Sequence, residues 1–234
     1  MDWSPLLISV QIAIPATIIT VLLGIFCAWR VYRSEKGSRR VMDVLLTLPL
    51  VLPPTVAGFL LLMLFGKSGF LGKPLYHMGI RIVFTKTAAV IAAVTISFPL
   101  MYRSAKAAFE QVDLKLIYAA RTLGMTEFTI FRRLLLPLAL PGVISGAILS
   151  FARALGEFGA TLMIAGNIPG VTQTLPQAIY MDIQSGQTGE ATGWVLILMI
   201  LSFVMILGMN VISLRKMKWE RKPDEPNRKN REEV

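Results

Sequence analysis

Cysteine and histidine are almost absent from this chain. Its 234 residues include one cysteine, Cys27, and one histidine, His77. A single cysteine cannot form a disulfide within the chain, so the sequence indicates no particular redox compartment. Neither an HExxH nor a CxxC pattern occurs, and a lone histidine in a predicted loop is more typical of a loop residue than of a metal ligand. We therefore expect no metal site in this chain.

Charged residues are also scarce. They make up 16% of the chain, hydrophobic residues make up 54%, and the mean hydropathy is +0.62. A soluble domain of this size could not solvate so much apolar surface, which indicates an integral membrane protein surrounded by lipid. The formal net charge of +10 would suggest nucleic acid in a soluble protein. Here the basic residues flank apolar segments, so we interpret them as topology signals and expect no nucleic-acid partner.

The sequence lacks a nucleotide site. Gly66-Lys67-Ser68 resembles the end of a phosphate-binding loop, but that pattern needs a glycine where this chain has Leu61, and it needs a preceding strand. An enzyme inside a membrane would need a polar catalytic constellation, and the apolar segments supply only Arg153 and Glu157. We therefore expect no bound cofactor and no catalytic residues.

Long apolar runs dominate the chain. Five segments approach the ~20 helical residues that cross a hydrocarbon core of ~30 Å. They are residues 6–29, 44–65, 85–105, 134–156 and 194–214. The third is the weakest, because Lys86 and Arg103 lie near its ends and could snorkel to the interface. The predicted fold class is all-α, a polytopic membrane domain over residues 1–220 with five transmembrane helices.

Basic residues predict the orientation of these spans. They gather in 30–40, 103–133 and 215–231, whereas 158–193 contains neither lysine nor arginine. With five spans the three basic segments fall on one side, which the positive-inside rule identifies as cytoplasmic. The amino terminus is then outside and the carboxyl terminus inside. The outer loop 66–84 still carries three basic residues, a mild departure from the rule.

The two ends of the chain need separate interpretation. The first span could be a cleaved signal peptide, but no basic residues precede it and its apolar run is longer than that of a signal peptide. We favour an uncleaved helix. Residues 221–234 are mostly charged or polar, and we expect them to form a disordered cytoplasmic tail.

The loop 110–137, between the third and fourth spans, predicts a bent pair of helices. Residues 110–123 have a helical pattern, with apolar positions on or near one face. These positions are Leu114, Ile117, Ala120 and Leu123. Gly124 suits the left-handed end of this helix, because glycine has no Cβ to clash. Thr126 can cap a second helix, with Glu127 at its positive end.

The spacing of this loop resembles the cytoplasmic coupling loop, or EAA loop, of ABC importer permeases. The matching residues are Ala119, Ala120, Gly124, Leu134, Leu136 and Pro137. The chain departs from the pattern at Tyr118, where the family has glutamate, so a pairing of that glutamate with a partner is not available here. The resemblance implies that residues 118–120, Gly124, Glu127, Leu136 and Pro137 couple this chain to an ATPase through a lever joined to the fourth span.

Three longer segments, 48–72, 97–124 and 136–170, resemble the molybdate permease family. Permeases for tungstate and sulfate share much of this pattern, including 154–160. The resemblance implies a homodimer of permeases and two copies of a cytoplasmic ABC ATPase, which would hold ATP and Mg²⁺. It also implies an external molybdate-binding protein, in which the selectivity for the oxyanion mainly resides.

Prolines and small residues mark candidate parts of a transport path. Pro53 and Pro54 interrupt the second span. Broken helices often line substrate paths in transporters, although prolines are frequent in membrane helices generally. Gly142, Gly146 and Ser150 give the fourth span a small-residue face that suits close packing. By family resemblance we place that face at the dimer axis, and packing within one subunit is the alternative.

Arg153 and Glu157 are spaced i, i+4 near the outer end of the fourth span. Ionisable groups inside a membrane suggest function, but a salt bridge between the two is the simpler interpretation. We interpret residues 153–160 as a hinge near the outer mouth and not as a tight anion site, because a pore must bind its ion weakly.

These observations favour the permease of an ATP-driven importer, most specifically for molybdate, with tungstate or sulfate as alternatives. A self-sufficient anion channel belongs to a different class, and it would not need the predicted elbow.

Overall fold

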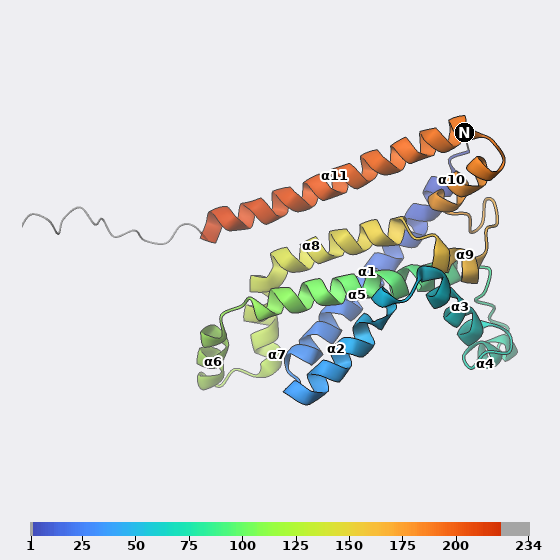
Figure 1. Ribbon diagram of the computed structural model, residues 1–234. Helices are drawn as coiled ribbons and strands as arrows, with labels where there is room; N and C mark the ends of the chain where they lie inside the picture. Colours follow the sequence, from blue (N-terminus) through green and yellow to red (C-terminus); the bar gives the residue numbers. More distant parts are fainter. Residues whose placement is uncertain (1, 221–234) are drawn as a thin grey trace, which may run out of the picture.

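The computed structural model describes residues 2–220, and the predicted tail 221–234 lies outside the described residues. Every regular element in the described range is helical (Figure 1). In chain order they are α1 (Ser4–Tyr32), α2 (Lys36–Val51), α3 (Pro54–Phe65), α4 (Gly72–His77), α5 (Lys86–Glu110), α6 (Leu114–Thr122), α7 (Glu127–Ile130), the π-helical turn η1 (Phe131–Leu135), α8 (Leu136–Leu155), α9 (Gly159–Ala165), α10 (Leu175–Gln184) and α11 (Thr188–Glu220).

Four helical stretches among the described residues are long and apolar enough to cross a membrane. They are α1, α5, the continuous run Glu127–Leu155 and the part of α11 up to Gly208. The bent pair α2–α3 makes a fifth span if it is counted as one. The all-helical, multi-pass fold class predicted from the sequence is therefore confirmed.

Helix α5 lies at the centre of the bundle, between α1 and α8 (Figure 1). Its small residues allow this close packing, since Ala89, Ala93 and Ala105 are completely buried. Glycines on the neighbouring helices contribute as well. A Cβ on Gly24 of α1 would lie 2.6 Å from Met101, and one on Gly146 of α8 would lie 2.5 Å from Ser104. Small side chains at the contacts let the backbones approach where no hydrophobic effect drives helices together.

The second predicted span, 44–65, is two helices that meet at an angle of 107°. α2 ends at Val51 and α3 starts at Pro54, so the break falls at the prolines that the sequence predicts to interrupt it. Proline donates no backbone hydrogen bond, and the residue before it avoids the helical conformation. After the bend, α3 packs on α9, where a Cβ on Gly58 would lie 2.6 Å from the backbone of Ala160.

The amino terminus and the start of α11 lie together. Trp3 and Trp194 meet edge to face, with ring centroids 5.5 Å apart. Tryptophans commonly occupy the interface between membrane and water, which fits this position at the ends of two apolar helices. α10 lies just before α11, and its capping box between Thr174 and Gln177 starts the helix.

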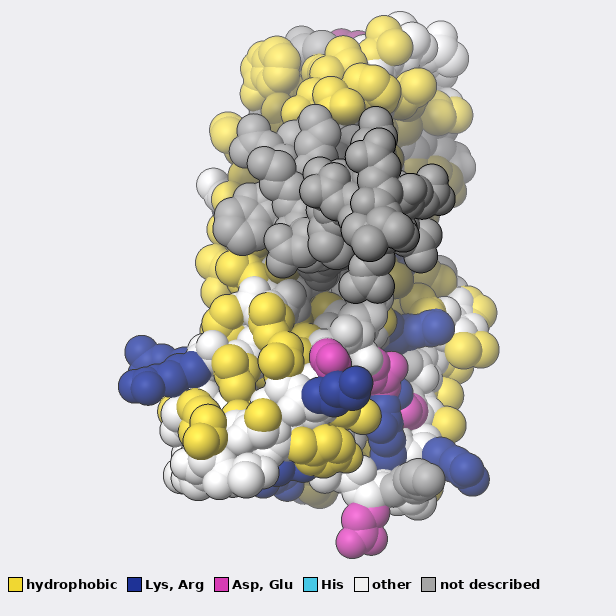
Figure 2. All heavy atoms as spheres, turned by 90° about the vertical axis from the view of Figure 1, so that its left-hand side faces the viewer, with side chains coloured by type: hydrophobic (Ala, Val, Ile, Leu, Met, Phe, Trp, Pro, Cys, Tyr) yellow, Lys and Arg dark blue, Asp and Glu magenta, His cyan; other side chains and the backbone are white. Residues whose placement is uncertain are grey.

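The two ends of the bundle differ in charge. In Figure 1 the α1–α2 turn, α6 and α7 lie at one end, and α4, α9, α10 and the amino terminus lie at the other. The first end holds the basic segments 30–40 and 103–133, and the second holds 66–84 and 158–193. Figure 2 shows lysine, arginine and acidic side chains gathered on the face that the first end presents. We call this first end the charged end.

Candidate functional site

A helical elbow joins α5 to α8 at the charged end. Its first arm, α6, leads into Gly124, whose φ of +76° is the left-handed conformation that the sequence indicates. Thr126 then caps the second arm, α7, and its hydroxyl accepts a hydrogen bond from the Thr129 amide at 3.3 Å. The elbow is therefore a helix, a glycine turn and a capped helix.

The first arm starts later in the chain than the sequence predicts. The prediction begins a helix at residue 110, but α5 continues to Glu110 and a new helix begins at Leu114. The Asp113 carboxylate causes this restart by accepting a hydrogen bond from the Lys115 amide at 2.8 Å. An aspartate cap at this position is a sequence signal that the prediction missed.

Ion pairs hold the two arms together and tie them to α1. Glu127 accepts hydrogen bonds from Arg121 Nε at 2.8 Å and Nη2 at 3.3 Å, and Arg33 Nε lies 3.6 Å from the same carboxylate. The hydrogen bond to Glu127 raises the pKa of Arg121. Trp29 of α1 stacks near Phe131, with ring centroids 4.7 Å apart. The elbow is therefore fixed to the charged end of the bundle by both charge and packing.

One side of α6 is buried, and several large apolar side chains around the rest of the elbow are exposed. Ile117 and Ala120 are buried, at 2% and 4% exposure. The exposed elbow face consists of large apolar residues that stand in solvent: Leu114, Leu116, Tyr118, Leu123 and Phe128. Ala119 is exposed beside them. Of the two predicted coupling alanines, Ala120 therefore anchors α6 in the core and Ala119 faces outward. Large apolar side chains exposed together at the charged end suit contact with a protein partner.

Tyr118 is the position at which the chain departs from the coupling-loop pattern that its sequence resembles. Its ring lies under the Arg121 guanidinium, 5.7 Å from ring centroid to Cζ. The aromatic ring thus offers Arg121 a cation–π contact, and Glu127 of the second arm supplies the carboxylate that pairs with it. An acidic residue of the elbow is therefore present at position 127 instead of 118, and it pairs with Arg121 inside the elbow.

The second arm runs into α8 without a break. The helix is continuous from Glu127 to Leu155, with a π-helical turn at η1 where the Leu136 amide donates to the Phe131 carbonyl. Pro137 explains this turn, because proline lacks the amide that would bond to the carbonyl of residue 133 and its ring crowds that carbonyl. Leu136 and Pro137, predicted as coupling residues, thus lie at the junction between elbow and membrane helix.

The predicted hinge near the other end of α8 is a break between two helices. α8 ends at Leu155, with Gly156 as its C-cap, and α9 starts at Gly159. Arg153 Nη1 lies 2.7 Å from Glu157 Oε2, and Glu157 Oε1 accepts from the Ala160 amide at 2.8 Å. Glu157 is only 2% exposed, so this pair serves to join α8 to α9.

The other path candidates lie apart from that hinge. Ser150 is completely buried within the subunit, so its side chain does not line an open surface there. Pro53 is exposed at the bend between α2 and α3, and Pro54 is partly buried as the first residue of α3. The structure thus separates these residues into a buried contact on α8 and an exposed bend in the second span.

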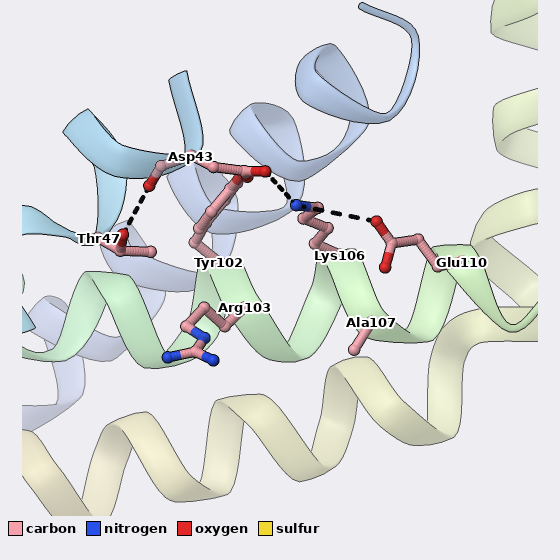
Figure 3. Close-up of a pocket in the computed structure, with 7 residues that line it drawn as sticks. All are labelled: Asp43, Thr47, Tyr102, Arg103, Lys106, Ala107 and Glu110. Atoms are coloured by element: carbon pink, nitrogen blue, oxygen red, sulfur yellow. Dashed lines mark hydrogen bonds and ion pairs between the residues drawn. The ribbon is translucent and has the colours of Figure 1, made fainter. Parts of the chain in front are cut away.

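A polar cavity of about 440 Å³ lies between α2 and α5, and the sequence analysis did not identify it (Figure 3). Its lining residues are Asp43, Thr47, Tyr102, Arg103, Lys106, Ala107 and Glu110. A usable signal was present: Tyr102, Lys106 and Glu110 follow each other at i, i+4 along α5, and a helix brings such residues onto one side.

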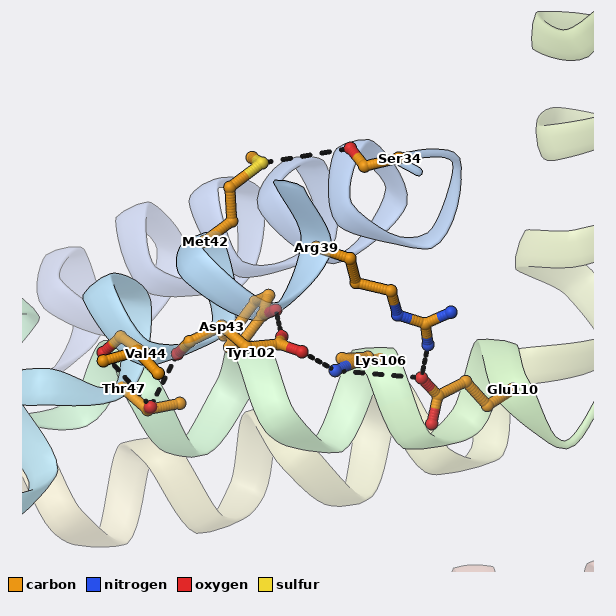
Figure 4. A network of polar contacts seen from close by, with 9 residues as sticks. All are labelled: Ser34, Arg39, Met42, Asp43, Val44, Thr47, Tyr102, Lys106 and Glu110. Atoms are coloured by element: carbon orange, nitrogen blue, oxygen red, sulfur yellow. Dashed lines mark hydrogen bonds and ion pairs between the residues drawn. The ribbon is translucent and has the colours of Figure 1, made fainter. Parts of the chain in front are cut away.

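A network of polar contacts crosses this cavity (Figure 4). Asp43 of α2 accepts hydrogen bonds from the Tyr102 hydroxyl and the Lys106 ammonium group of α5. Arg39 pairs with Glu110, and Lys106 Nζ lies 3.8 Å from Glu110 Oε1. Both carboxylates are therefore already paired with cations. Within residues 2–220, no group of three histidine, cysteine or acidic side chains is arranged to hold a metal ion.

Comparison with known proteins finds relatives along most of the chain. A permease protein of Bacillus subtilis described as a putative molybdenum transport system permease is 44% identical over 205 residues, which cover 87% of this chain and 90% of the relative. The molybdenum transport system permease protein ModB of Escherichia coli is 46% identical over 193 residues, which cover 81% of this chain and 84% of the relative.

A solved structure shares the fold. A chain of the MetNI methionine ABC transporter, in an inward-facing conformation, superposes with a TM-score of 0.72 at 16% identity, covering 90% of this chain and 94% of that one. The family model of the binding-protein-dependent transport system inner membrane component matches residues 20–217. With this match and relatives above 40% identity, the chain belongs to the family of binding-protein-dependent transport system inner membrane components.

Proposed function

We propose that this chain is the permease of an ATP-driven importer that carries molybdate across the cytoplasmic membrane. The observation that carries the general function is the elbow, whose exposed apolar face is joined by an unbroken helix to α8. The choice of molybdate is supported by the relatives in Bacillus subtilis and Escherichia coli, whose names refer to molybdenum transport.

The elbow suits the task of passing motion into the membrane. A partner that binds the exposed elbow face would move α6 and α7 together, because the Arg121–Glu127 ion pair joins them. The continuous helix Glu127–Leu155 would transmit this movement into the bundle. The contacts of Arg33 with Glu127 and of Trp29 with Phe131 would transmit it to α1. ATP binding would close the ATPase pair and open the path outward, and hydrolysis would return it inward.

The partners follow from this scheme. Two copies of a cytoplasmic ABC ATPase would bind ATP and Mg²⁺, and this chain would bind neither. Two copies of the permease would form a homodimer around the path, embedded in lipid. An external molybdate-binding protein would dock over the outer loops 66–84 and 160–191. The amino terminus is outside and the carboxyl terminus inside in this arrangement, because the basic segments mark the cytoplasmic side.

Selectivity for the anion would reside in the external binding protein. Tight binding of a dianion needs several charge-assisted donors, each worth ~1.5–3 kcal/mol. Arg153, the cation near the outer hinge, is already paired with Glu157 at 2.7 Å. The permease would therefore pass the ion and hold it only weakly.

Reconstitution in liposomes tests this function directly. The purified permease would be combined with its ATPase and the oxyanion-loaded binding protein, and uptake of molybdate, tungstate and sulfate would be measured. We expect ATP-dependent uptake, with molybdate preferred. Uptake of none of the three oxyanions by the complete system would refute the proposal.

The same liposomes separate the permease from a self-sufficient channel. The chain alone, without ATPase, is expected to give no anion flux. Conductance by the isolated chain would favour the channel. If the complete system prefers tungstate or sulfate, the proposal of an importer stands and the proposal of molybdate as its substrate fails.

A further inference from the structure

Arg103 is exposed on the inner half of α5, the central helix of the bundle. It lines the cavity between α2 and α5 together with Ala107 and Glu110, and all three are exposed. Their spacing of four and three residues places them along one stripe of the helix. Figure 3 shows Arg103 pointing away from the contact between Asp43 and Lys106. The stripe therefore adjoins the row of Tyr102, Lys106 and Glu110 and shares Glu110 with it, and its residues Arg103 and Ala107 are exposed.

The place of Arg103 along α5 corresponds to the hydrocarbon core of a bilayer centred on that helix. The helix α5 runs from Lys86 to Glu110, and at 1.5 Å per residue Arg103 lies about 8 Å from its middle. A hydrocarbon core of about 30 Å extends about 15 Å to each side of its centre. Ionisable side chains at such depth face the interior of a helix bundle or a water-filled cavity. The predicted span 85–105 puts Arg103 near its end, where it could snorkel, but α5 continues to Glu110.

Arg103 differs from the neighbouring cations in having no partner. Lys106 contacts Asp43 and lies 3.8 Å from Glu110, and Arg39 pairs with Glu110. Among residues 2–35 and 37–208, whose side chains the structure describes, Arg103 makes no hydrogen bond, ion pair or ring contact. The cavity and its rim thus hold three cations and two carboxylates, and the unbalanced charge belongs to Arg103.

We propose that Arg103 and the cavity it lines form a transient contact site for a tetrahedral oxyanion on the cytoplasmic half of the transport path. This inference rests on the importer function proposed above. A guanidinium group offers a planar fork of donors that matches two oxygens of an oxyanion. The cavity of about 440 Å³ leaves room for the ion with part of its water.

The site is weak for a physical reason. One arginine supplies at most two strong hydrogen bonds, and the nearby Asp43 repels a dianion. Weak binding suits a position that the ion must leave in each cycle. Arg153 does not meet these conditions, because Glu157 already neutralises it at 2.7 Å.

A phosphate of a lipid headgroup offers Arg103 the same chemistry as the transported ion. The transported ion is the ligand we assign to Arg103, because this residue lines a polar cavity between helices. The lipid is the competing outcome of the test.

The first experiment neutralises the charge in the complete transporter. Arg103→Gln and Arg103→Lys would be compared with Arg30→Gln, which removes an exposed arginine from the same end of the bundle outside the cavity. We expect Arg103→Gln to lower molybdate uptake about tenfold, the effect of losing one charge-assisted hydrogen bond. Arg103→Lys should recover part of the rate, and Arg30→Gln should match wild type. Equal uptake by wild type and Arg103→Gln would overturn the inference.

The second experiment keeps Arg103 and measures access to the cavity. Ala107→Cys would be placed in a Cys27→Ser background, which removes the chain's one native cysteine. We expect a negatively charged thiol reagent to react faster than a positively charged one, and millimolar molybdate to protect the thiol. Protection by anionic lipid in the vesicles and none by molybdate would assign Arg103 to a headgroup and overturn the inference.

Failure of this inference can be told from failure of the proposed function. If the wild-type transporter imports no oxyanion, the importer function itself fails. If the wild type imports molybdate and Arg103→Gln imports it equally well, only the contact site fails. Co-purification of each variant with the ATPase shows whether the substitution acts on the path or on assembly. Loss of ATPase binding by Arg103→Gln in proportion to the loss of uptake would also count against the site.

Discussion

The two ends of the bundle both rely on ion pairs, but the pairs differ in exposure. At the charged end the side chains of Arg121 and Glu127 are 45% and 33% exposed, and water surrounds the pair. At the opposite end Arg153 is 32% exposed, but Glu157 is 2% exposed and lies between Arg153 and the start of α9. An exposed pair contributes little stability and can rearrange when a partner docks, whereas a buried carboxylate cannot lose its cation without a larger cost. The charged end is thus suited to receive a partner, and the opposite end is suited to keep its shape.

The two ends can differ in role only if they lie on opposite sides of the membrane. Reporter fusions that test this topology are expected to show the largest effect. A reporter enzyme that is active only outside the cytoplasm would be fused after Gly79 or after Val234. We expect activity for the first fusion and none for the second, because the basic segments mark the side of the carboxyl terminus. The same compartment for both fusion points would contradict the five-span arrangement.

Gly124→Leu tests whether the elbow transmits motion. Gly124 has a φ of +76°, which a leucine adopts at a cost of about 1 kcal/mol or more. A Cβ there meets nothing within 4 Å, so the fold should persist while the side chain extends toward the partner. We expect loss of ATPase co-purification and of uptake, with the protein still inserted in the membrane.

The matched control is Gly186→Leu. Gly186 has a φ of +78° and equally open surroundings, but it lies between α10 and α11 at the opposite end. It carries the same backbone strain away from the elbow, so co-purification with the ATPase should remain. Full uptake by Gly124→Leu would argue against the elbow as the coupling element.

The smallest effects are expected when Glu157 and Glu127 are neutralised one at a time. The ratio of the two losses in stability tests whether burial distinguishes the two ends. Glu157→Gln keeps the shape of the side chain but removes the charge opposite Arg153, and we expect it to cost roughly 1–3 kcal/mol of stability. Glu127→Gln does the same at the exposed pair and should cost less than about 1 kcal/mol. Thermal unfolding of the two variants, monitored by their helical signal, measures both. Equal costs would mean that burial does not distinguish the two ends.

Much of the elbow was predictable from local chemistry. The left-handed conformation of Gly124, the cap at Thr126 and the entry of Pro137 into the next helix depend on residues close in sequence. The break at Pro53 and Pro54 has the same origin, because proline acts on its own backbone and on the residue before it. The start of α6 was placed too early, since the cap at Asp113 starts a new helix inside a helical pattern that continues through it.

The cavity at Arg103 was not predictable in the same way. It requires Asp43 of α2 to meet Tyr102 and Lys106 of α5, residues that are far apart in the chain. A single sequence without relatives shows which helices are apolar but not which sides of them face each other. The exposed or buried state of each arginine depends on that arrangement, and so does the choice between Arg103 and Arg153 as the cation open to an anion.

The sequence by itself determined the class of the molecule: an apolar composition, runs long enough to cross a bilayer, basic segments that orient them, and local signals for the elbow and the helix breaks. These properties are set by composition and by interactions within a few residues. Only the tertiary structure decided which charges are paired, because ion pairs such as Asp43–Lys106 join helices whose separation depends on the packing of small residues along α5. Among the side chains that the structure describes, that packing leaves Arg103 without a partner while it pairs the cations around it.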